Sequence, residues 1–72
     1  MIQALLDEIK RNIDAEQKAI DDYDLLISHL KGAGLGKDAL VVKKKIRDDE
    51  VEHKMLLIRM AKALIMKELR RH

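Results

Sequence analysis

The chain has 72 residues, of which 47% are hydrophobic and 39% are charged. Cysteine and proline are absent, so disulfides and thiolate metal ligands are excluded and long uninterrupted helices are favoured. The net charge of +2 comes from 15 basic and 13 acidic residues, which is a mixed surface rather than the strongly basic one typical of nucleic-acid binding. A chain this short buries little surface by itself, and we therefore expect it to associate with other chains.

The first predicted element is a helix over about residues 2–31. Two rows of mostly apolar residues run along it with a spacing of seven, which is typical of a helix packed against other helices. One row contains Ile2, Ile9, Glu16, Tyr23 and Leu30, and the other contains Leu6, Ile13, Ile20 and Ile27. Glu16 is the only charged member of these rows. A buried ionised carboxylate is unfavourable unless something pairs with it, so Glu16 is expected to have a partner.

A glycine-rich loop is predicted at residues 32–37, which contain all three glycines of the chain. Gly32 is expected to end the first helix, and Asp38 is expected to cap the N-terminus of the second. The second helix is predicted over about residues 38–70. Because the loop is short, the two helices should be antiparallel neighbours, so that residues 1–72 form a single helical hairpin.

The second helix has a similar irregularity in its apolar rows. One row contains Ala39, Ile46, His53 and Met60, and the other contains Glu50, Leu57 and Leu64. Glu50 and His53 interrupt this apolar face with the spacing Glu-x-x-His. Counted from Leu35 in the loop, Glu16 lies nineteen positions back, whereas Glu50 and His53 lie fifteen and eighteen positions forward. The three side chains are therefore expected at a similar height along the hairpin.

Two such hairpins paired about a twofold axis would form a four-helix bundle with four carboxylates and two imidazoles at its centre. Two divalent cations would neutralise the four carboxylates, and oxygen and imidazole ligands suit iron or manganese, with zinc as a possible substitute. We therefore predict a homodimer, or a multiple of dimers, that binds two metal ions per dimer through Glu16, Glu50 and His53. The other histidines, His29 and His72, have no acidic residue three positions earlier.

The combination of Glu16, Tyr23, Asp49, Glu50 and His53 resembles one half of the ferritin-like di-iron domain. It is similar to the pattern in rubrerythrin, bacterioferritin and the two-helix encapsulated ferritins. The resemblance implies that Glu16 and Glu50 are carboxylate ligands and that His53 gives one nitrogen to each metal. It also implies that Tyr23 donates its hydroxyl to a ligating carboxylate and that Asp49 holds the second nitrogen of His53.

The resemblance extends over about residues 6–60 and implies a ferroxidase or peroxide-reducing oxidoreductase. Dioxygen or hydrogen peroxide would be the oxidant, in iron handling or in defence against oxidative stress. Rubrerythrin also has a cysteine-coordinated iron centre, which this cysteine-free chain cannot form. Encapsulated ferritins work inside a protein compartment and commonly end in a targeting tail, whereas residues 67–72 have the pattern of a helix end.

Two other functions remain open at the level of the sequence. A dimer of helical hairpins could serve as a non-catalytic module that binds RNA or protein, which the pI of about 9.0 permits. A metal site could also have a purely structural role. Taken singly, Tyr23 has the pattern of a core residue and Asp49 that of a solvated acid. The sequence shows no signal peptide and no apolar run of transmembrane length, so we expect a cytoplasmic protein without a membrane partner.

Overall fold

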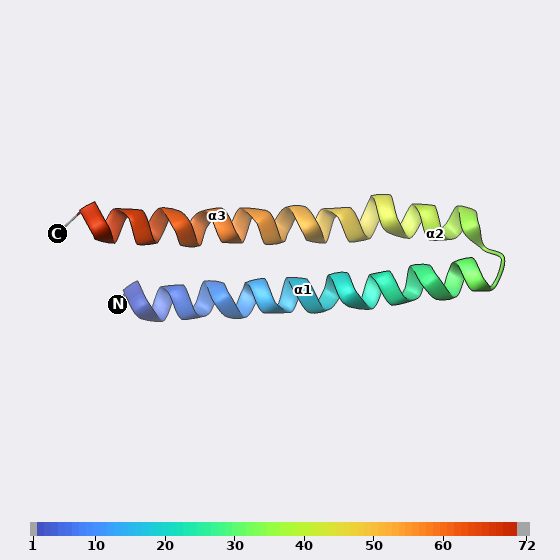
Figure 1. The fold of residues 1–72 in the computed structure, drawn as a ribbon, viewed down its shortest axis with the longest axis horizontal. Coiled ribbons are helices and arrows are strands. Elements are labelled where there is room, and N and C mark those ends of the chain that lie inside the picture. The colour runs from blue at the N-terminus through green and yellow to red at the C-terminus, as the bar shows by residue number, and fades with distance from the viewer. Residues whose placement is uncertain (1, 71–72) are drawn as a thin grey trace.

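The computed structural model describes residues 2–70 and consists there of helices joined by one turn. Helix α1 (Ile2–Gly32) is followed by α2 (Gly36–Val42), a π-helical segment η1 (Lys43–Arg47) and α3 (Asp48–Arg70). The last three elements follow one another directly and make one long rod. Figure 1 shows this rod beside α1 and running in the opposite direction, in a molecule 57 Å long and 16 by 11 Å across. The predicted all-helical class is confirmed.

A glycine ends α1, as the sequence predicts, but the glycine is Gly34 rather than Gly32. The backbone N–H of Gly34 donates to the carbonyl of Lys31 at 3.1 Å, and that of Leu35 donates to the carbonyl of Leu30 at 2.8 Å. This pair of bonds is the Schellman motif, which requires a left-handed residue after the helix. Gly34 supplies it with a φ of 79°, a value that glycine adopts without strain. Gly32, the expected stop, is the last residue of α1.

The second rod begins at Gly36, so the loop spans only residues 33–35 instead of 32–37. Asp38 is not its N-cap, because the residue before the helix is Leu35 and no side chain caps the first turn. Asp38 lies inside that turn instead, where its negative charge interacts favourably with the helix dipole. Asp38 lies near the start of the helix, as predicted, but its predicted role as the N-cap is wrong.

Both seven-residue rows of α1 contribute to the contact with the second rod, as the pattern predicts. Ile20 and Ile27 are buried, at 4% and 8% exposure, and the other members of the two rows are half-buried. Glu16 is among the half-buried residues. The position of Glu16 in α1 therefore agrees with the expectation that its carboxyl is partly removed from water.

In the second rod, no single row of residues spaced by seven stays in contact with α1 along the whole length. Ala39 is fully buried, but Ile46, His53 and Met60 are exposed, although they follow it at steps of seven. In the single chain, the prediction that these four residues line one buried row is wrong. The adjacent row agrees better with expectation, because Glu50 and the leucines that follow it are half-buried.

The π-helical segment Lys43–Arg47 explains this change of row. A π-helix closes its hydrogen bonds over five residues rather than four, so a π turn accommodates an additional residue. From the last residue of this segment onward, the half-buried row contains Arg47, Lys54 and Ala61. Arg47 lies eight positions after Ala39, whereas a regular heptad row would place the next member at seven. The additional residue rotates α3 so that the row containing His53 lies at the side of the contact.

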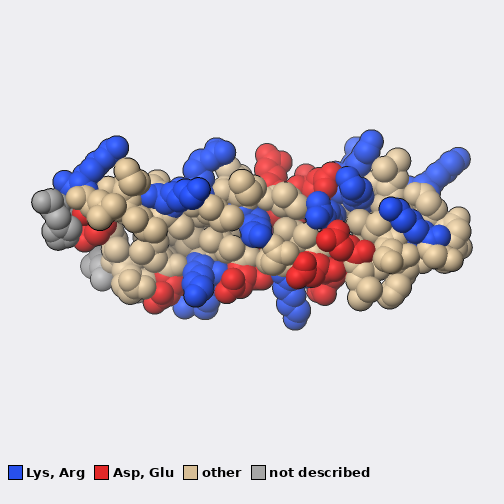
Figure 2. Space-filling model, in the orientation of Figure 1, with Lys and Arg blue, Asp and Glu red and all other residues tan. Residues whose placement is uncertain are grey.

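Much apolar surface remains exposed in the single chain. Within residues 2–70, only three hydrophobic residues are buried, whereas thirteen large hydrophobic side chains are exposed. Figure 2 shows uncharged side chains reaching the surface between the charged ones along the length of one face. The contact between the two rods therefore does not enclose a full core. No helix in the described part of the chain is long and apolar enough to cross a membrane.

Candidate metal centre

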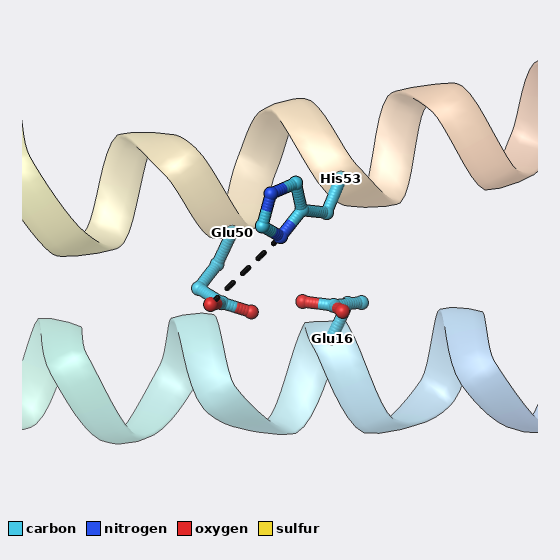
Figure 3. Close-up of side chains that lie close together, drawn as sticks. All are labelled: Glu16, Glu50 and His53. Atoms are coloured by element: carbon cyan, nitrogen blue, oxygen red, sulfur yellow. Dashed lines mark ion pairs between the residues drawn. The ribbon is translucent and has the colours of Figure 1, made fainter.

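Glu16 of α1 and Glu50 and His53 of α3 come together between the two rods (Figure 3). Each contributes one potential ligand atom, and these three atoms lie within 4.8 Å of one another. The two carboxyl groups point toward each other across the space between the helices, and the His53 ring lies beside Glu50. Across residues 2–70, no second group of three or more potential metal ligands is this close.

The positions of the three side chains follow from the helices that carry them. Glu50 and His53 are three residues apart, so they are neighbours on one face of α3, and Nδ1 of His53 is 4.0 Å from Oε1 of Glu50. The side chain of Glu50 is 25% exposed, whereas that of His53 is 56% exposed. The carboxyl groups therefore lie toward the interior and the imidazole lies at the rim. The site is open on the side of His53.

Glu16 is the electrostatically unusual member of the cluster. Its Oε2 is inaccessible to solvent and is the only buried side-chain nitrogen or oxygen within residues 2–70 that has no hydrogen-bond partner. The pKa of Glu16 is raised, first because its protonated form can share a hydrogen bond with Glu50 that two ionised carboxylates cannot make, and then by burial and by the negative charge of Glu50. A protonated His53 acts in the opposite direction. Without a cation, Glu16 is thus held in a place that disfavours its charge.

The donor set fits a divalent metal ion. A cation would give the unpartnered Oε2 of Glu16 a partner and would remove the repulsion between the two carboxylates. Two carboxylates and one imidazole, without sulfur, suit iron, manganese or zinc. Within residues 2–70, this cluster offers three such groups, and further ligands would have to come from elsewhere.

Tyr23 and Asp49, which were expected to support the ligands, lie close to them in sequence but are not bonded to them. Tyr23 is half-buried and Asp49 is exposed. Neither side chain makes a hydrogen bond or ion pair within the described part of the chain. Their supporting roles therefore stay predictions. His29 is exposed and outside the cluster, and His72 lies outside the described residues.

Sequence reasoning missed the polar contacts that cross between the helices beside the cluster. Nε of Arg47 donates to Oδ1 of Asp24 at 2.9 Å, and the same guanidinium lies 3.5 Å from Oδ1 of Asp48. Nζ of Lys54 donates to Oε1 of Gln17. These pairings depend on the rotation that the π-helical segment imposes, and no residue pattern in the sequence indicates that segment.

Comparison of the chain with models of protein families, with curated proteins and with solved structures gives no significant match.

Proposed function

We propose that this chain is a di-iron or di-manganese protein, and that two copies of its helical hairpin form a ferritin-like four-helix bundle around the metals. The observation that carries the proposal is the convergence of Glu16, Glu50 and His53, with their ligand atoms within 4.8 Å of one another and one buried carboxylate oxygen left without a partner. Ligands of this kind, in a polar cluster between helices, are those of carboxylate-bridged metal pairs.

The same residues support a second copy as the partner. One hairpin supplies only half of the ligands that a two-metal centre of this class uses. His53 is exposed at the rim, and Leu56 and Met60, which share its helix face, are 42% and 53% exposed. A copy related by a twofold axis near Glu16 would cover these apolar side chains and double the ligand set to four carboxylates and two imidazoles.

The roles of the residues follow from their chemistry. Glu16 and Glu50 would hold the metals through carboxylate oxygens, and His53 would hold one metal per chain through a ring nitrogen. A bound cation would favour the ionised form of Glu16 and so oppose the raised pKa of this carboxyl. With iron bound, the site would supply a centre at which dioxygen or hydrogen peroxide oxidises Fe(II). The activity that we propose is thus that of a ferroxidase or peroxide-reducing oxidoreductase in iron handling or oxidative-stress defence.

The test compares two histidine variants with the unchanged protein. His53→Ala removes one nitrogen ligand per chain from an exposed position, so the helices should still form while iron binding weakens and aerobic Fe(II) oxidation slows. His29→Ala is the matched control, because His29 is an exposed histidine of α1 outside the cluster. Metal content by elemental analysis and Fe(II) consumption by a chromogenic assay would be measured. Equal metal content and equal oxidation rates in the two variants would rule out the site.

An interaction module is the second candidate, and the thirteen exposed large hydrophobic side chains favour it. Such a module needs no carboxylates or imidazole at its centre. It would purify without stoichiometric metal, and it would keep its partner after His53→Ala. A purely structural metal site would give a third result, with metal bound in the dimer but no acceleration of Fe(II) oxidation.

A further inference from the structure

A hydrogen bond between the helices directly adjoins the ligand cluster. Nζ of Lys54 in α3 donates to Oε1 of Gln17 in α1, and both residues are half-buried. Gln17 is the residue after Glu16, and Lys54 is the residue after His53. The bond therefore ties the two helices together at the backbone positions next to two of the proposed ligands.

A second tie lies on the other side of Glu50. Arg47 is three residues before Glu50 and donates across to Asp24, whereas Lys54 is four residues after it. Residues at these spacings share one face of a helix. The π-helical segment turns this face toward α1, as the burial of the two basic residues shows. Glu50 is thus bracketed by two polar contacts that oppose sliding and rotation of α3 along α1.

We propose that Lys54 and Gln17 are positioning residues of the metal centre, and that their hydrogen bond holds α3 at the axial position where the carboxyl groups of Glu16 and Glu50 meet. This inference rests on the proposed metal-binding function. A slip of one residue along a helix displaces a side chain by about 1.5 Å, which is large compared with the tolerance of metal–ligand distances. The bond also leaves both ligands free, because it uses neighbouring side chains.

The charge of Lys54 makes the inference testable by the sign of an effect. A positive charge near a bound cation opposes binding, so removal of that charge alone should raise the affinity for metal. Loss of a positioning contact should lower the affinity, typically by about tenfold or more for residues that support metal ligands. The two effects of replacing Lys54 therefore have opposite directions.

The experiment is a calorimetric titration with zinc, which does not change its redox state. It compares the unchanged protein, Lys54→Met, and the double variant Gln17→Lys with Lys54→Gln, which exchanges donor and acceptor across the helices. Lys62→Met is the matched control, since it makes the same charge change at an exposed residue of α3 that has no side-chain partner within residues 2–70. Circular dichroism at the temperature of the titration shows whether each variant is helical.

We expect Lys54→Met to bind zinc about tenfold more weakly, the exchanged pair to recover most of the loss, and Lys62→Met to bind like the unchanged protein. A helical Lys54→Met that binds as tightly as Lys62→Met, or more tightly, would overturn the positioning role while leaving the metal site in place. If Lys54→Met does not fold, the exchanged double variant decides: weak zinc binding by a folded double variant would overturn the positioning role. Absence of zinc binding by the unchanged protein would instead overturn the proposed function, and this inference with it.

Discussion

Glu16 shows how one residue can be recognised from sequence and still need the structure for its chemistry. Its charge stands out because the other members of its two rows are uncharged and recur every seven residues. The structure adds that Oε2 is buried without a partner and that the Glu50 carboxyl raises the pKa of Glu16. The rows predict that Glu16 and Glu50 meet, but the burial of one carboxylate oxygen without a partner depends on how the surrounding side chains pack.

The pKa of Glu16 predicts how the stability of the metal-free protein depends on pH. A raised pKa means that the folded protein binds this proton more tightly than the unfolded chain does. The associated stability is fully present below the ordinary pKa of 4.5 and is lost as pH rises from there through the raised value. Urea unfolding of chelator-treated protein should therefore show the unchanged protein losing stability with rising pH relative to Glu16→Gln, which is neutral throughout.

The unchanged protein and the Glu16→Gln variant serve as each other's control, because all other titrating groups are common to both. A stability difference that stays constant across the acid-to-neutral range, or that moves in favour of the unchanged protein as pH rises, would contradict the prediction. Metal binding should show the opposite trend in the unchanged protein, since protons compete with the cation for the carboxylates.

At the scale of the helices, the sequence predicts the existence and approximate length of both rods. Apolar rows and the absence of proline favour long helices, and the glycines can only interrupt them between residues 32 and 36. The boundary details depend on backbone geometry that the residue pattern leaves undetermined. Gly34 rather than Gly32 takes the left-handed conformation, and this lets the second rod begin at Gly36.

The rotation of α3 could not be predicted for a related reason. The row from Ala39 to Met60 has the spacing of a regular α-helix, and a π-helical segment shifts everything beyond it by one residue. That shift brings Lys54 and Arg47 against α1 and leaves Met60 exposed. The three candidate residues still come together despite this shift, with their potential ligand atoms within 4.8 Å of one another.

Deletion of Lys44 tests this account of the π-helical segment. Lys44 is exposed within the segment, and without it Ala39 and Arg47 would be seven positions apart, as a regular helix requires. Because π-helical turns are less favourable than α-helical ones, we expect a melting temperature equal to or above that of the unchanged protein, and unchanged zinc binding. The measurements are thermal melting by circular dichroism and zinc titration.

The control is deletion of Arg59, an exposed residue of α3 in a regular α-helical stretch. There the deletion should rotate the rest of α3 away from α1 and lower the melting temperature. If deletion of Lys44 destabilised the protein as much as deletion of Arg59, the segment would not contain a surplus residue.

For the molecule as a whole, the balance of buried and exposed apolar side chains predicts self-association. Met60 lies one heptad after His53 on the same face of α3, whereas Met55 is only two residues from His53 and lies toward the opposite side. Both are similarly exposed, at 53% and 54%. Met60→Glu should place like charges at the proposed dimer contact and should shift sedimentation toward the monomer, with less metal bound per chain.

Met55→Glu introduces the same charge at the same exposure and should leave the dimer and its metal content intact. The dimer hypothesis would be wrong if the Met60→Glu protein sedimented and bound metal like the Met55→Glu protein. It would also be wrong if the unchanged protein were a monomer with a full complement of metal at micromolar concentration.

The exposed position of His53 has a consequence for assembly. Each chain would offer an incomplete set of ligands at its rim, so the affinity of one copy for another and the affinity of either for metal become thermodynamically linked. Raising the free metal concentration would then drive dimer formation, and raising the protein concentration would tighten metal binding by the same coupling free energy. Scarcity of metal would release separate hairpins whose apolar rims are uncovered, so the oligomer itself would report how much metal is available.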